Sequence, residues 1–409
     1  MRRVVITGIG IISPVGNDRQ SFAKNLEAGR HGIDFITGFD ASAHKAKLAA
    51  EVKDFNPLDH MPKPEARRTD RFAQFAVAAA AQAVEDSGGL FAPPERTGAY
   101  VGAGIGGIAT FEAEAGKCIK SGPSAVSPYF IAMMIPNMAS GAISIKYGIT
   151  GPTLPVVTAC ATSSHAIGEA FRTIKHGYAD VILAGGSEAA ITPLSVAGFT
   201  NNTALSLSED KDSASIPFDA RRNGFVMGEG AAVMVLEEYE QAKKRGAKIY
   251  AEISGYANTA DASHITAPRE DGRSAANAMA GALKEAGIST GSASKIYVNA
   301  HGTSTPLNDK IETLALKSVF GADAYSLAIS STKSMTGHCL GAAGAIEAAA
   351  CALTLSSGII FPTAGYLQAD ADCDLDYTVR GAVRKEVTAA LSNSFGFGGH
   401  NACLCLTKV

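Results

Sequence analysis

The chain has 409 residues, enough for two domains or one duplicated fold, and 46% of them are apolar. Its formal net charge of −3 gives no overall attraction to nucleic acid or to an anionic membrane, so neither partner is expected. The seven cysteines form neither a Cys-x-x-Cys pair nor a zinc-ligand spacing, which fits a reducing cytoplasm.

The first half alternates strands and helices. The apolar run after Arg3 is interrupted by Gly8 and Gly10, so it predicts a buried strand rather than a signal peptide. No apolar run reaches the roughly 20 residues that span a bilayer, so no membrane segment is expected. In chain order we expect a strand at 4–10, helices at 17–28 and 70–83, strands at 98–102 and 181–184, a strand at 231–236, a polar helix at 239–245 and a strand at 249–256.

Gly102 to Gly107 satisfies the pattern G-x-G-x-x-G directly after a strand, which makes a nicotinamide-dependent dehydrogenase an alternative to consider. The dinucleotide fingerprint needs a second strand about twenty residues later that ends in an acidic ribose ligand. The stretch 117–123 has no strand pattern. The sequence therefore disfavours dinucleotide binding.

The most reactive candidate lies in the stretch 156–168. Val156 to Thr158 predicts the end of a strand, and a helical pattern then extends to Ile174. Cys160 is therefore expected where a strand meets a helix N-terminus, where free N–H groups and the helix dipole favour the thiolate. A buried structural cysteine is the alternative interpretation.

The second half repeats the pattern of the first. A helix at 273–286, a strand at 296–298 and a polar loop match the helix, strand and loop at 70–107. A strand at 328–330, a helix at 340–355 and a strand at 359–360 match the strand, helix and strand around Cys160. We therefore predict a duplicated α/β fold with a first half at 1–254, carrying the nucleophile, and a second half at 255–409, carrying the polar loops.

Three loops of the second half add reactive groups. His301 follows a strand and precedes Thr303 and Thr305, while a second loop holds Lys333 and His338. For each of these residues a purely structural role is the alternative interpretation: His301 as a histidine of the core, and Lys333 as a lysine that only neutralises Glu347. The third loop, 392–401, is rich in glycine, so its backbone N–H groups can point at a ligand oxygen. A thiolate that takes an acyl group and two imidazoles that stabilise an enolate would suit chemistry on thioesters.

The motifs at 158–161, 299–303, 332–338 and 393–399 resemble those of the β-ketoacyl-(acyl carrier protein) synthases, the condensing enzymes of type II fatty acid synthesis. The resemblance covers essentially the whole chain. It implies a thiolase-like duplicated αβαβα five-layer fold, a homodimer and acyl carrier protein as partner. The implied reaction is a decarboxylative Claisen condensation that elongates fatty acids, with no cofactor beyond the phosphopantetheine arm of the carrier. A polyketide-type ketosynthase, with the same mechanism, is the alternative.

The same resemblance assigns roles to residues. Cys160 would be acylated, and its backbone N–H and that of Phe397 would form an oxyanion hole, with Phe397 also acting as a mobile gate. His301 and His338 would bind the malonyl thioester carbonyl, and Lys333 would order the site electrostatically. Thr303 and Thr305 would bind the pantetheine arm, and the acyl chain would contact Ile105, Phe199, Phe395 and, across a dimer, Phe130. The carrier protein would bind to Lys63, Arg67 and Arg68. A monovalent cation would be held by Asn299, Glu347, Ser392 and Asn393. His400 stands where many members carry threonine, which we expect to change the loop chemistry little.

Overall fold

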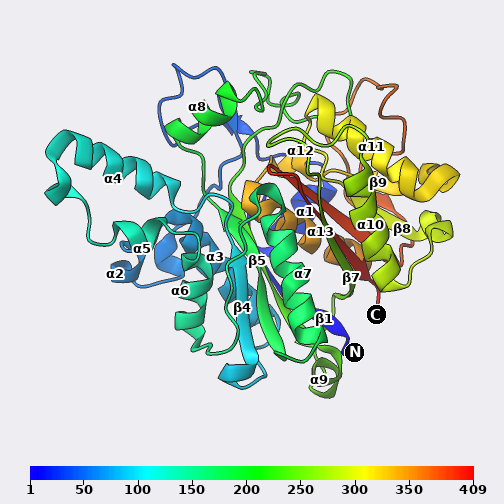
Figure 1. Cartoon of the computed structure of the whole chain (residues 1–409), viewed down its shortest axis with the longest axis horizontal. Helices are drawn as coiled ribbons and strands as arrows, with labels where there is room; N and C mark the ends of the chain where they lie inside the picture. Colours follow the sequence, from blue (N-terminus) through cyan, green and yellow to red (C-terminus); the bar gives the residue numbers. More distant parts are fainter.

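The computed structural model describes all 409 residues, and a nine-stranded mixed sheet runs through it (Figure 1). The strands lie in the order β4-β5-β6-β1-β7-β13-β12-β8-β9. Their bounds are β1 Val4–Ile12, β4 Thr97–Gly102, β5 Val181–Glu188, β6 Gly230–Glu238, β7 Ala251–Ala260, β8 Ile296–Asn299, β9 Ala328–Ser330, β12 Ala389–Gly396 and β13 His400–Thr407.

The sheet consists of two units with the same connectivity. In the first, β1 and β5 both pair antiparallel with β6, and β4 lies parallel to β5. In the second, β7 and β12 both pair antiparallel with β13, and β8 lies parallel to β12. The two units meet only where Val4 to Ile6 of β1 pair with β7. The predicted boundary between 254 and 255 falls inside β7.

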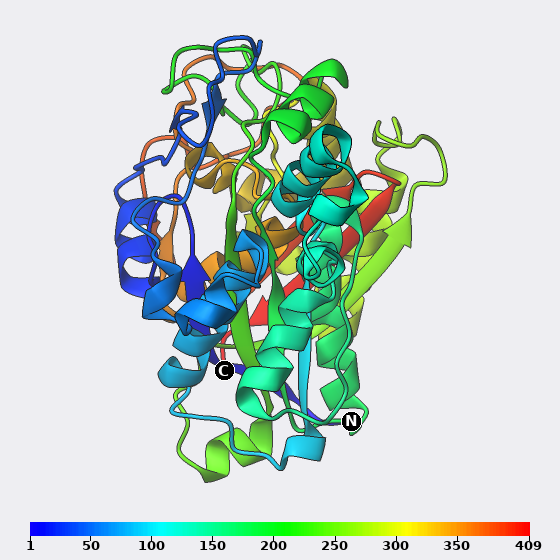
Figure 2. The same ribbon diagram turned by 90° about the vertical axis from the view of Figure 1, so that its left-hand side faces the viewer.

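Helices complete the five αβαβα layers. Between the two units lie α7 (Thr162–Lys175) and α13 (Ala343–Ser357), as Figures 1 and 2 show. One outer face carries α3 (Arg71–Asp86) and α6 (Met138–Tyr147), and the other carries α10 (Arg273–Ala286) and α11 (Pro306–Phe320). The predicted fold class is confirmed.

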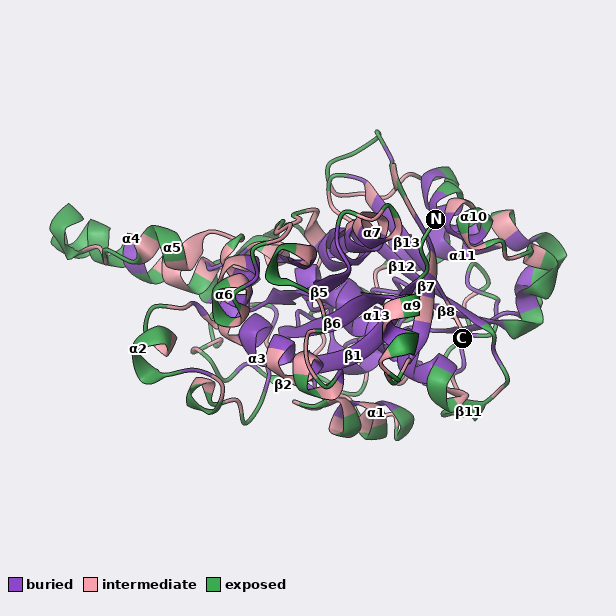
Figure 3. Cartoon of the chain, turned by 90° about the horizontal axis from the view of Figure 1, so that it is seen from below, coloured by how far each residue is buried: buried purple, intermediate pink, exposed green.

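Alternation along the strands explains why these layers form. On β5, Ile182 and Ala184 join the core around α7 and α13, whereas Val181 and Leu183 join the core around α3. Because successive strand residues point to opposite faces, a strand that is apolar on both faces must be covered on both. The purple centre of Figure 3 is this buried sheet and its central helices.

The remaining elements are short or lie at the periphery. α4 and α5 extend away from the body of the molecule and are largely exposed in Figures 1 and 3. The bounds are α1 Arg19–Glu27, α2 Lys63–Ala66, α4 Ile108–Ser121, α5 Phe130–Met134, α8 Pro193–Asn201, α9 Tyr239–Lys244 and α12 Lys333–Thr336, with the two-residue strands β2 Asp34–Phe35, β3 Leu48–Ala49, β10 Ile359–Ile360 and β11 Val383–Arg384.

One predicted strand is absent, and another forms where predicted but has a different place in the fold. Residues 156–158 form no strand: the main chain bridges to β4 only at Thr153 and Ala99, because it then turns inward towards Cys160. β-branched residues favour an extended backbone, but they do not by themselves supply a neighbour to pair with. The residues 359–360 pair with β11 outside the main sheet, so β12 and not β10 is the counterpart of β5.

One segment is long and apolar enough to cross a membrane by length and composition. It is Leu340–Ser357, which contains α13, and 89% of it is buried inside the protein. Its neighbours are the strands on both sides and α7. The segment is therefore the core helix of the central layer.

Candidate active site

Cys160 lies in a short 3-10 turn, Ala159–Ala161, directly before α7. The residue before it, Ala159, has a φ of +50°, a left-handed conformation that costs a non-glycine residue roughly 1–3 kcal/mol. The Thr158 N–H donates to Thr162 Oγ1 at 2.8 Å and fixes the turn against the helix. The helix predicted after Cys160 is confirmed, and Cys160 is held by a strained turn instead of a strand end.

The environment of Cys160 does not favour the thiolate. Burial raises the pKa of the Cys160 thiol to about 12, although Lys333 and the Phe397 N–H act in the opposite direction. The sequence prediction of a lowered thiol pKa is therefore wrong. Desolvation in the interior outweighs the favourable field of one helix end, because only the charged form loses its hydration.

His301 is held by its backbone. Its N–H donates to Glu312 Oε1 at 2.9 Å, and the Gly302 N–H donates to Glu312 Oε2 at 2.8 Å. Asn393 Nδ2 donates to the same carboxylate at 3.0 Å. Burial raises the pKa of Glu312 to about 7, opposed by these hydrogen bonds. The sequence analysis missed Glu312; its signal was an acidic residue one position after Ile311, on the apolar face of a helix.

His338 lies opposite His301. Its backbone N–H donates to the Val226 carbonyl at 2.7 Å. Its ring contacts the ring of Phe225, with the two centroids 5.1 Å apart. The Nδ1 atoms of both His301 and His338 are buried without a hydrogen-bond partner. Burial and the charge of Lys333 hold the pKa of both imidazoles well below the usual value. Two neutral imidazoles therefore face each other, free to bond a ligand.

Lys333 is buried beneath these groups and forms an ion pair with the buried carboxylate of Glu347. Burial raises the pKa of Glu347 to about 7, and Lys333 opposes that shift. The ion pair that the alternative interpretation assumes between Lys333 and Glu347 is thus present. The same charge also lowers the pKa of Cys160 and of both histidines, so it acts on the site as well.

A cavity of about 90 Å³ joins Cys160, His301 and His338, whereas Lys333 does not line it. Eight residues predicted from the sequence line this cavity: Cys160, Phe199, His301, Thr303, Thr305, His338, Phe395 and Phe397. Ile105 packs in the apolar cluster that contains Cys160 but does not line the cavity. Phe130 packs on Phe111 of α4 and is not part of the cavity in this single chain.

The glycine-rich loop after β4 is occupied by a side chain. The N–H groups of Gly104, Ile105 and Gly106 all lie within hydrogen-bond distance of the Glu188 carboxylate. A pyrophosphate would need those same N–H groups. The N–H groups of the loop therefore already have an anionic partner, which removes the structural basis for the dehydrogenase alternative.

Four side chains of β8, α13 and β12 carry oxygen atoms without a hydrogen-bond partner. Asn299 Oδ1, Glu347 Oε2, Ser392 Oγ and Asn393 Oδ1 are all buried and all lack a hydrogen-bond partner. These are the four residues predicted to hold a monovalent cation. Oxygen ligands with one carboxylate suit a hard cation, so the donor set fits.

The predicted carrier-protein residues lie apart from the cavity. Lys63, in α2, and Arg67 and Arg68, which follow it, are exposed. The Arg68 guanidinium lies 4.7 Å from the centre of the Tyr129 ring, next to α5. They form a basic edge at the base of the projecting helices.

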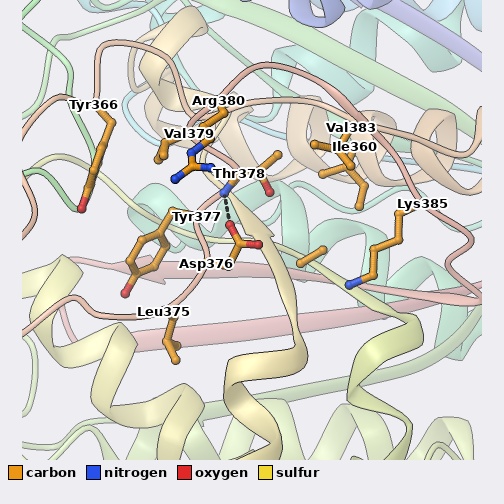
Figure 4. A pocket seen from close by; sticks show the side chains of 11 residues that line it. Ile360, Tyr366, Leu375, Asp376, Tyr377, Thr378, Val379, Arg380, Val383 and Lys385 are labelled. Carbon is orange, nitrogen blue, oxygen red and sulfur yellow. Dashed lines mark hydrogen bonds between the residues drawn. The ribbon is translucent and has the colours of Figure 1, made fainter.

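A second hollow, of about 440 Å³, is lined by Ala328, Ile360 and residues between 366 and 385 (Figure 4). Its walls include Tyr366, Asp376, Arg380 and Lys385. None of the predicted site residues lines it. The cavity at Cys160 is smaller but holds the reactive groups, so it is the candidate active site.

The chain matches two family models, "Beta-ketoacyl synthase, N-terminal domain" over residues 1–242 and "Beta-ketoacyl synthase, C-terminal domain" over residues 250–367. It is 49% identical over 410 residues to "3-oxoacyl-(acyl-carrier-protein) synthase 2" of Synechocystis sp., covering 100% of this chain and 98% of that protein. It is 48% identical to the protein of the same name in Staphylococcus aureus (strain COL), with the same coverage.

Solved structures agree with these matches. A β-ketoacyl synthase from Burkholderia phymatum is 35% identical with a TM-score of 0.92, covering 100% of both chains. A type II polyketide ketosynthase, solved in complex with its acyl carrier protein and bound to a hexaketide, is 34% identical with a TM-score of 0.91, covering 100% of this chain and 99% of that one.

Proposed function

The chain belongs to the β-ketoacyl synthase family, and we propose that Cys160, His301, His338 and Lys333 perform in it the decarboxylative condensation that elongates fatty acids. The substrates are malonyl-acyl carrier protein and an acyl chain on Cys160, and the products are 3-oxoacyl-acyl carrier protein and carbon dioxide. The observation that carries the proposal is the shared cavity of one cysteine and two neutral imidazoles.

The first half-reaction transfers an acyl group to Cys160. Burial raises the pKa of the thiol to about 12, so it is protonated at the start, and a neutral imidazole in the same cavity can relay its proton to the sulfur of the departing carrier. The sulfur attacks the thioester carbonyl, and the carrier's thiol leaves. The N–H groups of Cys160 and Phe397 stabilise the oxyanion; Phe397 belongs to the turn that touches the nucleophile.

The second half-reaction releases carbon dioxide. His301 and His338 donate hydrogen bonds to the malonyl thioester carbonyl, so the bond between the malonyl methylene and carboxylate breaks to leave a stabilised enolate. That carbanion attacks the acyl carbonyl on Cys160. The Cys160 thiolate then leaves and takes up one proton from water to restore the thiol, and the 3-oxoacyl chain departs on the carrier. Burial keeps both imidazoles neutral, and the charge of Lys333 acts in the same direction.

The entrance to the cavity suits a pantetheine arm. Thr303 and Thr305 line it, and their hydroxyls lie 3.0 Å apart. We assign the basic edge of Lys63, Arg67 and Arg68 to an acidic carrier protein. The polyketide ketosynthase complexed with its carrier supports this partner. The higher identity to 3-oxoacyl-(acyl-carrier-protein) synthases favours fatty acids over polyketides as products.

An exposed edge supports a homodimer. Beside β4 the extended segment 153–158 has only a single bridge, and Leu154 and Val157 on it are 52% and 50% exposed. An unpaired apolar edge of this kind is a template for a second copy. The projecting α4 and α5 would then pack on the partner and bring Phe130 to the acyl pocket of the partner.

The seven free cysteines fit a cytoplasmic location.

A monovalent cation would satisfy the four unpartnered oxygens of Asn299, Glu347, Ser392 and Asn393. It would supply structural charge beneath the histidine loops and no reaction step. At ten times its dissociation constant, potassium would add about 1.4 kcal/mol to the free energy of unfolding. Thermal unfolding in potassium chloride against choline chloride tests this, and Ser392→Ala should remove the difference.

The function is tested by mass spectrometry of the intact protein after incubation with acyl carrier proteins of different chain lengths. A single acyl adduct that peptide mapping places on Cys160 is expected, followed by its loss when malonyl-acyl carrier protein is added. An adduct elsewhere, or none, would contradict the proposal. The chain length that reacts fastest reports the preference of the acyl pocket.

A further inference from the structure

Two imidazoles outside the cavity connect the two sides of the proposed oxyanion hole. The first is His165, on α7. Its Nδ1 lies 2.7 Å from Thr158 Oγ1, two residues before Cys160. Burial lowers the pKa of His165 to about 4, so the ring is neutral at pH 7. His165 therefore fixes the segment that leads into the nucleophile turn.

The second imidazole is His400, the first residue of β13. It is paired with Gly396 of β12, so the turn between the strands consists of Phe397, Gly398 and Gly399. A Cβ atom built on Gly398 would lie 3.1 Å from two ring atoms of His400. The imidazole therefore packs against the turn directly after Phe397.

These two rings touch each other. Their centroids are 6.3 Å apart and their planes are 87° apart, an edge-to-face contact. The contacts Thr158–His165–His400–Gly398 thus run from the residue preceding the nucleophile turn to the residue following Phe397.

Neither ring reaches the substrate. His165 and His400 line a separate surface hollow of about 410 Å³ and are absent from the walls of the catalytic cavity. Between the two sites lies the backbone itself, since a Cβ on Gly396 would lie 3.2 Å from the Cys160 nitrogen. An effect of either histidine on the reaction must therefore pass through the turn.

We propose that His165 and His400 are positioning residues that hold the N–H groups of Cys160 and Phe397 at the separation an acyl oxyanion requires. The inference rests on the proposed function, because it concerns the acylation of Cys160. Two other contacts anchor the turn, from the Gly398 N–H to the Ile265 carbonyl at 2.7 Å and from the Asp261 N–H to the Gly399 carbonyl at 2.8 Å. Loss of the His400 ring should therefore displace the turn without unfolding it.

The test separates the two half-reactions in His400→Thr, for which the sequence pattern predicts a small effect and the ring contact a larger one. Removing an oxyanion donor outright costs roughly 100- to 1000-fold, so a displaced donor should slow acylation of Cys160 by about tenfold in kcat, with KM for the acyl carrier substrate nearly unchanged. Carbon dioxide release from malonyl-acyl carrier protein, measured in a Cys160→Ala background with and without His400→Thr, should be unchanged. His400→Phe retains an aromatic ring and should restore most of the acylation rate.

The matched control is His176→Thr, which changes an exposed histidine beyond the far end of α7 and should leave both half-reactions unchanged. The proposal is overturned if His400→Thr acylates at the wild-type rate, or if acylation and decarboxylation fall together. If His400→Thr does not fold, His400→Phe decides alone. Near-normal acylation by this variant would support ring packing as the way in which His400 acts on acylation. Acylation slowed a hundredfold, with decarboxylation intact, would contradict ring packing. Failure of the wild type to acylate Cys160 would instead contradict the proposed function.

Discussion

The rings of His301 and His338 meet edge to face, with centroids 5.4 Å apart and planes 87° apart. This arrangement places two imidazoles from different loops at one cavity, each with a buried nitrogen that no protein group satisfies. A proton on one ring would be repelled by the nearby charge of Lys333. The pair therefore remains neutral, the state in which each ring offers one donor and one lone pair.

The neutral pair predicts a flat pH dependence for decarboxylation. Because the pKa of both imidazoles lies well below the usual value, lowering the pH from 8 to roughly 6 should not protonate either ring. Carbon dioxide release by Cys160→Ala should therefore be constant over this range. A fall with a midpoint near 6.5 would show ordinary histidines and contradict the burial argument.

Replacing the nucleophile should separate the two half-reactions. Cys160→Ala should abolish condensation and the acyl adduct, while decarboxylation on His301 and His338 continues. Intact-protein mass spectrometry and carbon dioxide release measure the two effects. Cys118→Ala, at the exposed cysteine of α4, is the matched control and should remain fully active. Condensation by Cys160→Ala would show that another group carries the acyl chain.

The raised thiol pKa predicts how Cys160 reacts with an alkylating agent. Because burial raises this pKa to about 12, the thiolate fraction of the free protein should increase about tenfold for each pH unit through the neutral range. The rate of iodoacetamide labelling at Cys160 should rise through pH 9 without a plateau. A plateau below pH 8 would mean that the helix end, and not desolvation, governs the thiol.

Replacing Glu312 should weaken the His301 loop and reduce decarboxylation less than replacing His301 itself. Glu312→Gln keeps the shape of the side chain but leaves one of two buried N–H groups without an acceptor, which costs about 1–3 kcal/mol of unfolding free energy. Decarboxylation should fall by about tenfold, less than the roughly 100- to 1000-fold expected for His301→Ala. Denaturant unfolding and carbon dioxide release measure the two quantities. Acylation of Cys160 should be spared, and its loss would argue for general disruption.

The exposed edge at 153–158 predicts the effect of a charge on assembly. Val157→Lys should place a cation in an apolar dimer interface and shift the protein towards monomer in sedimentation velocity. Leu367→Lys, at a side chain that is 81% exposed and far along the chain, is the matched control. A wild type that sediments as a monomer, or an unchanged Val157→Lys dimer, would refute this interface.

Much of the site could be predicted because each reactive residue lies in a short motif. Cys160, His301 and His338 stand in loops next to apolar segments, so local pattern locates them and the resemblance gives them a joint chemistry. Glu312 escaped notice because it lies on a helix outside the reactive motifs, where an acidic residue beside Ile311 is a weak local signal. Its role follows only from the loop that the fold places against it.

By itself, the sequence determined a duplicated α/β fold, most of its strands and helices, and the identity of the reactive side chains, because periodicity and loop composition are local properties. The five-layer arrangement was implied by the family resemblance. The tertiary structure decided how those side chains behave. It buried Cys160 so that its thiol pKa rises where the helix position alone predicted a fall. It also left residues 156–158 without a sheet partner. Desolvation and strand pairing both depend on what the rest of the chain places nearby, and no local pattern records that.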